Sequence, residues 1–78
     1  MPLTVKDAER IAREFWKEKN YEEIDIYSCK PIRPGGYKVN SGGKKSGKTQ
    51  YDELEIEMDD KGEVFSYDIS PGMEVLRG

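Results

Sequence analysis

The segment from Tyr51 to Asp59 alternates between apolar and acidic side chains, and this pattern constrains the fold of the chain more than any other. A period of two is typical of a strand in a sheet that has one face on a core and the other in water. We therefore expect a strand at residues 50–59. Its core-facing residues are Leu54, Ile56 and Met58, and its water-facing residues are Glu53, Glu55 and Glu57.

The residues that follow predict a hairpin. The sequence Asp-Lys-Gly at 60–62 is typical of a tight turn in which the glycine adopts the left-handed conformation. A returning strand is expected at about residues 63–70. One face of that strand carries Phe65, Tyr67 and Ile69.

A helical pattern occupies residues 4–19, where apolar side chains recur at spacings of three and four. Thr4 has the chemistry of an N-cap, and the Asp7 carboxylate three residues later can bond back to the amide of the cap. Asn20 is a natural helix stop. The apolar stripe of this helix consists of Val5, Ala8, Ile11, Ala12, Phe15 and Trp16.

Two further strands and a loop are expected between the helix and the hairpin. Two isoleucines alternate with polar residues in a strand at about 22–30, and the prolines that follow cannot donate ladder hydrogen bonds. A short returning strand is expected at 37–39. Residues 40–48 hold three Gly, two Ser and no apolar side chain, which predicts a flexible basic loop.

These elements predict one α+β domain, in which a single helix packs on one face of a three- or four-stranded antiparallel sheet. No helical segment lies between the strands, so parallel crossover units are excluded. The centre of the core is expected where Ile11 and Phe15 of the helix contact Leu54, Ile56 and Phe65 of the strands. A C-terminal tail is expected to close one end of the core with Met73, Val75 and Leu76.

The composition excludes several kinds of site. The chain has no His, so it lacks the usual neutral-pH base and the commonest metal ligand. Its single cysteine, Cys29, can form neither an internal disulfide nor a zinc-binding cluster and is expected to be structural. We expect no enzyme activity, cofactor or metal. Early charges and the lack of a long apolar run predict a cytoplasmic protein without a membrane segment.

Residues 42–49 match the phosphate-binding pattern GxxxxGK[ST] letter for letter. A working loop of this kind follows a buried parallel strand and opens a helix, whose N-terminus faces the phosphate. Downstream of this match the apolar residues have strand periodicity, and no further βαβ unit follows. We therefore expect no nucleotide hydrolysis here.

Charge is segregated along the chain, although the formal net charge is only −3. Residues 30–48 hold six basic and no acidic side chains, whereas residues 52–63 hold seven acidic side chains and one Lys. The basic segment is either a surface for anions or nucleic acid, or a set of lysines that keeps a loop and a sheet edge soluble. The candidate anion-binding residues are Arg33, Lys38, Lys44, Lys45 and Lys48.

Tyrosines on the expected strands form a second candidate surface. Tyr supplies contact area at low entropic cost, so Tyr27 and Tyr51 would form a recognition patch if they share the outer sheet face. Cross-strand spacers are the alternative interpretation. The candidate protein-contact residues are Tyr27, Tyr37 and Tyr51.

Two segments resemble a PepSY-type domain. Residues 3–12, LTVKDAERIA, are similar to the capped helix of that family. Residues 51–65, ending in MDDKGEVF, look like its strand–turn–strand hairpin. The resemblance implies a cystatin-like helix on an antiparallel sheet and a non-catalytic binding or inhibitory module, often beside peptidases.

The sequence therefore predicts a small binding or regulatory module that recognises a protein or peptide through the open sheet face or an edge strand. Anion or nucleic-acid binding through residues 30–48 is the alternative. The chain is expected to be a monomer or an edge-paired homodimer, because the strand before Pro31 can leave an edge for a second copy.

Overall fold

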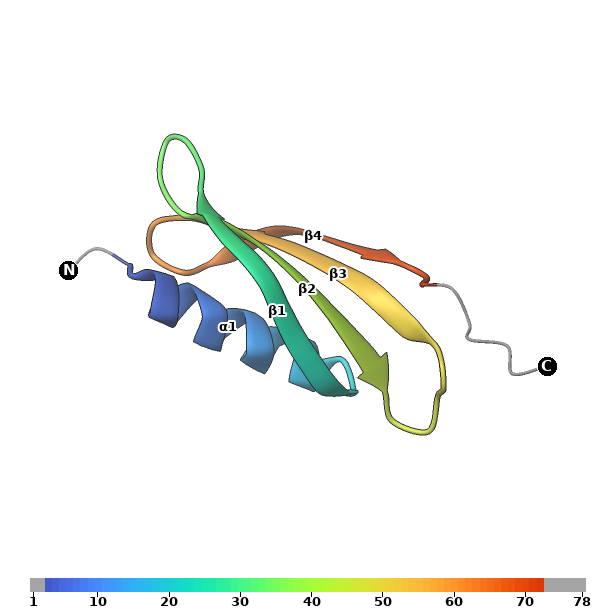
Figure 1. The fold of residues 1–78 in the computed structure, drawn as a ribbon. Coiled ribbons are helices and arrows are strands. Elements are labelled where there is room, and N and C mark those ends of the chain that lie inside the picture. The colour runs from blue at the N-terminus through green and yellow to red at the C-terminus, as the bar shows by residue number, and fades with distance from the viewer. Residues whose placement is uncertain (1–2, 73–78) are drawn as a thin grey trace.

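The computed structural model describes residues 3–72, which form one helix and four strands. The strands make a single antiparallel sheet in the order β1-β2-β3-β4, and the helix packs on one of its faces (Figure 1). This arrangement confirms the predicted α+β class. The predicted tail at residues 73–76 lies outside the described residues. The elements are α1 (Val5–Glu18), β1 (Tyr21–Pro31), β2 (Tyr37–Lys45), β3 (Tyr51–Met58) and β4 (Val64–Ser70).

Helix α1 begins and ends where its local sequence predicts. The Thr4 hydroxyl accepts a hydrogen bond from the Asp7 N–H at 3.1 Å, and the Asp7 carboxylate accepts one from the Thr4 N–H at 3.2 Å. This reciprocal pair is a capping box and satisfies two N–H groups that a helix start leaves without partners. After the helix, Asn20 adopts the left-handed conformation with a φ of 73°.

The core lies between α1 and the inner strands of the sheet. The alternation in β3 is confirmed, because Leu54, Ile56 and Met58 are all buried on the helix side. Val39 of β2 pairs with Ile56 in the register and is fully buried beside it. Trp16 is the largest fully buried side chain and brings the helix into this cluster. Burial of each such side chain contributes about 1.5–3 kcal/mol.

Strand β2 is longer than the sequence predicts. It continues to Lys45, so residues 40–45 of the expected flexible loop lie in the sheet and the connection to β3 is only residues 46–50. The reason is close packing at Gly42 and Gly43. A Cβ on Gly42 would collide with the Tyr27 hydroxyl, and one on Gly43 would lie 2.8 Å from the Glu23 carbonyl oxygen. These glycines permit close approach of neighbouring groups within a strand.

The same strand accounts for the phosphate-loop match. Residues 42–45 of the match belong to β2, and the segment that follows the connection is the antiparallel strand β3. A phosphate-binding loop requires a parallel strand before it and a helix after it. Here β2 is antiparallel to both of its neighbours, and no helix lies at residues 46–58.

Helix α1 packs mainly against β1 and β2 and leaves β4 largely uncovered (Figure 1). A helix with its side chains is about 10–12 Å wide, whereas the outer backbones of four strands are about 14 Å apart. The expectation that Phe65 lies in the core is wrong, since its side chain is 61% exposed. A register shift leaves Phe65 without a partner in β3, and Val64 lies opposite Met58 and packs against the core instead. Tyr67 and Ile69 are 51% and 36% exposed.

Candidate functional site

The outer edge of β4 is the strongest candidate for a binding site. β4 ends the strand order, and β3 is its only strand partner within residues 3–72. Alternate main-chain N–H and C=O groups on its outer side are therefore available to another strand. Only one of its seven residues, Asp68, carries a charge. A seven-residue edge with so little charge is a template for strand addition.

Exposed apolar side chains follow this edge, and we call Phe65, Tyr67 and Ile69 the apolar strip. The Tyr67 ring centroid lies 5.3 Å from that of Phe15 and 5.9 Å from that of Trp16. Lys19 Nζ lies 4.8 Å from the same centroid, in cation–π geometry. These contacts hold the ring in place while half of its surface remains exposed. Binding of a partner to this ring therefore costs little side-chain entropy.

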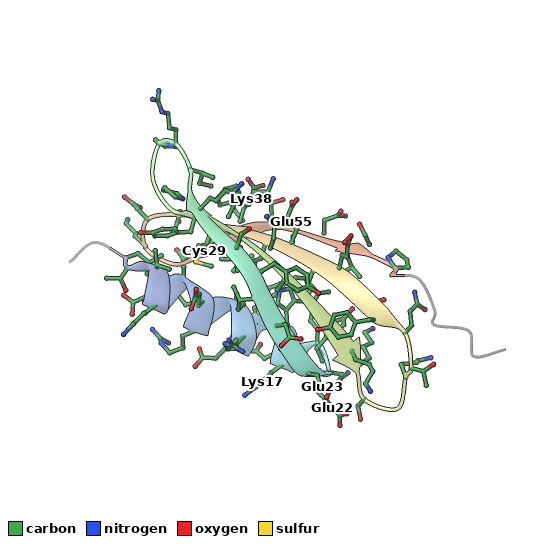
Figure 2. The ribbon with its side chains drawn as sticks, in the orientation of Figure 1. Lys17, Glu22, Glu23, Cys29, Lys38 and Glu55 are labelled. Atoms are coloured by element: carbon green, nitrogen blue, oxygen red, sulfur yellow. The ribbon has the colours of Figure 1, made fainter. Side chains whose placement is uncertain are left out.

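Acidic side chains line the open face of the sheet, which is the face opposite α1. Glu53, Glu55 and Glu57 of β3 lie on this face because the residues between them point into the core. Lys38 of β2 lies beside Glu55, and its Nζ is 3.2 Å from the Glu55 carboxylate (Figure 2). Among residues 3–72 this is the only ion pair that involves a carboxylate of β3 or β4.

A shallow hollow of about 210 Å³ lies in this face, and we call it the acidic hollow. Tyr27 and Asn40 form its wall on β1 and β2. Its wall on β3 and β4 includes three carboxylates and one hydroxyl, from Glu53, Glu55, Asp68 and Ser70. The hollow therefore adjoins the β4 edge and presents negative charge there.

The structure brings two of the three candidate contact tyrosines together. Tyr27 and Tyr51 both lie over Gly42 on the open face, and the Tyr51 hydroxyl donates a hydrogen bond to Asp25. This hydrogen bond, with burial, raises the pKa of Tyr51 above its usual value. Tyr37 lies elsewhere, since its hydroxyl donates to the Leu3 carbonyl oxygen at 3.2 Å, near the start of α1.

The five candidate anion-binding residues do not form one cluster. Arg33 and Lys48 lie in connections at opposite ends of β2. Lys38 and Lys44 are paired with carboxylates on the open face, the latter with Glu23 at 3.3 Å. Lys45 instead lies over the Tyr21 ring, with its Nζ 5.6 Å from the centroid. Their charges are thus dispersed and partly compensated, which is unlike the continuous basic groove of nucleic-acid binders.

Cys29 lies on the helix side of β1, half-buried against the core. Burial raises the pKa of its thiol, and the negative charge of Glu9 acts in the same direction. The group is therefore held in its less nucleophilic protonated form. Within residues 3–72 no three His, Cys, Asp or Glu side chains are grouped so that they could hold a metal ion.

Comparisons of the chain with protein-family models, with curated proteins and with solved structures found no match. The resemblance to PepSY-type domains therefore stays a prediction. In the described part of the chain, the helix is too short and too polar to cross a membrane.

From the sequence alone, β4 was not expected to be the binding edge. One signal was available, because residues 64–70 contain no Lys or Arg, which are the residues that usually protect a sheet edge. This signal could be used only after β4 was known to be the last strand, and strand order depends on tertiary contacts. The sequence analysis therefore did not predict that Phe65, Tyr67, Asp68 and Ile69 belong to a binding site.

Proposed function

We propose that this chain is a non-catalytic binding module, which recognises a protein by adding an extended segment of that protein to the outer edge of β4. The observation that supports this proposal is the unpaired β4 edge with the apolar strip beside it. In strand addition, main-chain hydrogen bonds supply affinity, and the alternate side chains of the segment supply specificity.

The edge of β1 is less suited to the same role. Its pairing with β2 is interrupted by irregularities between Tyr21 and Glu23 and between Ile26 and Ser28. Such bulges twist an edge and disturb the regular spacing that a new strand needs. Strand β4 has one such shift, opposite Glu57 and Met58, and its register is regular from Ser66 to Ser70.

The expected complex is reversible. A seven-residue strand offers a small contact area, and interfaces below about 1,200 Å² are typical of transient complexes. The held ring of Tyr67 and the exposed ring of Phe65 provide the aromatic anchors on which such small interfaces depend.

Selection of a random linear nine-residue peptide library on the immobilised chain tests this proposal. The variant Phe65→Lys places a charge in the apolar strip, and Glu22→Lys is its matched control because Glu22 is exposed on β1, at the other end of the strand order. We expect peptides enriched on the natural chain to lose at least tenfold in affinity for Phe65→Lys and to retain affinity for Glu22→Lys. Loss only with Glu22→Lys would assign binding to the β1 edge, and failure to enrich any peptide would reject the proposal.

A further inference from the structure

The charges beside the β4 edge identify the chemistry of the segment that binds there. We propose that this segment is an extended peptide with Lys or Arg at alternate positions and apolar side chains at the positions between them. This inference rests on the proposed function, since it specifies the partner of the same edge.

The register of the sheet determines which partner residues face the acidic side chains. Ser66, Asp68 and Ser70 of β4 pair with Glu57, Glu55 and Glu53 of β3, so these three β4 residues lie on the open face. Residues directly opposite each other on neighbouring strands share a face. A partner residue opposite Asp68 therefore also points to the open face, beside the acidic hollow.

Most of the carboxylates near the edge have no ion-pair partner in the described part of the chain. Among residues 3–72, no ion pair involves Glu53, Glu57 or Asp68, whereas Glu55 is paired with Lys38. The β3 backbone would lie two strand spacings, or about 10 Å, from an added strand. A Lys or Arg side chain opposite Asp68 would contact that carboxylate and extend over β4 toward the acidic hollow, because long basic side chains lie along a surface with the charge in water.

The positions between the basic residues face the other side of the sheet. There they lie beside Tyr67 and Ile69, whose side chains point to the helix side. Apolar partner side chains would cover the exposed surface of Tyr67 and Ile69. A charged partner side chain at these positions would be placed against the rings instead of against the carboxylates. The edge thus selects an alternating pattern, with each kind of side chain matched to one face.

A second copy of this chain fits the edge less well. Antiparallel pairing of two β4 strands about Tyr67 would set Ser66 against Asp68 of the other copy on the open face, and neither residue is basic. It would also join two acidic rows in one continuous sheet face, where like charges repel. A nucleic acid is disfavoured for the same reason, since phosphates would approach the acidic hollow.

Two synthetic nine-residue peptides test the inference with fluorescence anisotropy. One alternates Lys with Val and Phe, and the other has Glu in place of every Lys. We expect the Lys peptide to bind at least tenfold more tightly at low salt, and we expect its affinity to fall as salt is raised. N-methylation of the alternate amides that face β4 should abolish binding of the Lys peptide, because the main-chain hydrogen bonds are then lost.

Charge reversal at the edge provides the matched variants. Asp68→Lys should weaken binding of the Lys peptide about tenfold and strengthen binding of the Glu peptide. Glu22→Lys makes the same change in net charge at an exposed residue of β1 and should leave both affinities within twofold of the natural chain.

The outcomes separate this inference from the proposal on which it rests. If the Glu peptide binds as tightly as the Lys peptide and both are sensitive to Phe65→Lys, the basic pattern is wrong and the β4 edge remains the site. If neither peptide binds and the library also yields none, the proposed function fails. If sedimentation shows a dimer that Phe65→Lys dissociates, the occupant of the edge is a second copy and the inference is overturned.

Discussion

The two edge strands of the sheet, β1 and β4, differ in their contacts with the rest of the molecule. β1 lies beside the helix, and Arg13 of α1 donates a hydrogen bond to the Ile24 carbonyl oxygen of β1 at 3.1 Å. Two irregularities in β1 disturb its edge further. β4 contacts the end of α1 through Tyr67, but it has no basic side chain of its own within the described residues. The β1 edge is therefore protected by its contacts with α1 and by its irregularities, whereas the β4 edge remains available.

The comparison shows how one helix creates an asymmetric sheet. A helix of 14 residues is long enough to follow a strand, but it covers only about half of a four-stranded sheet. Tyr67 and Ile69 of β4 are consequently exposed in part, although they have the alternation of a core strand. Exposed apolar surface that alternates along a free edge is typical of an interaction site.

The largest expected effect concerns Trp16, whose side chain links α1 to both β1 and β4. Trp16 is fully buried, and its ring packs edge-on against Tyr21 of β1 and Tyr67 of β4. Trp16→Ala should lower the free energy of unfolding by about 3–5 kcal/mol, through lost burial and the cavity that remains. Phe65→Ala, at an exposed aromatic residue of β4, should change it by less than about 0.5 kcal/mol. Urea denaturation measures both, and equal effects would contradict the assignment of Phe65 to the surface.

A smaller effect is expected at the protected edge. Arg13→Met keeps much of the side-chain length but removes the hydrogen bond to Ile24, and it should lower the free energy of unfolding by about 1 kcal/mol. Amide hydrogen exchange in β1 should become faster, while exchange in β4 should not change.

Arg10→Met is the matched control, because the ion pairs of Arg10 within residues 3–72, with Asp7 and Glu14, are exposed. Such pairs contribute about 0.3–0.5 kcal/mol. If both variants change the exchange of β1 equally, Arg13 has no special role at that edge.

The smallest effect is expected from the turn that leads into β4. The Asp59 carboxylate accepts hydrogen bonds from the N–H groups of Lys61 and Glu63, each at 2.9 Å. The bond from the Glu63 N–H, and to a smaller extent that from the Lys61 N–H, lowers the pKa of Asp59 below its usual value. Because the folded pKa is lower than the unfolded one, the stabilisation is present above about pH 4 and is lost as pH falls through the folded pKa.

Asp59→Asn should therefore reduce the loss of melting temperature as the pH falls below about 4. The neutral amide can still accept the turn hydrogen bonds, so the fold should remain. Asp60→Asn, in the same turn, is the control. An unchanged acid profile for Asp59→Asn would show that this carboxylate does not stabilise the turn.

Much of the fold could be predicted from local patterns. The capping box at Thr4 and Asp7, the left-handed residue at Asn20 and the alternation in β3 all appear where the sequence places them. Each depends on interactions among residues a few positions apart, or on a periodicity that one strand displays by itself. The antiparallel arrangement also followed, because no helix separates the strands.

The extent of β2 could not be predicted in the same way. Gly42 and Gly43 indicate a loop when only their neighbours in the sequence are considered. In the structure they are strand residues, because Tyr27 and Tyr51 from other strands fill the space above Gly42. Those side chains come close only when the sheet has formed.

The candidate site likewise combines features that the sequence determines with features that depend on the tertiary structure. The sequence by itself determined which residues of β3 and β4 share a face, since that depends on a period of two. It also established the charge of each face. Only the tertiary structure decided that β4 is an outer strand and that its apolar residues remain exposed. That outcome depends on where the single helix packs, because the helix is too narrow to cover both edges of the sheet.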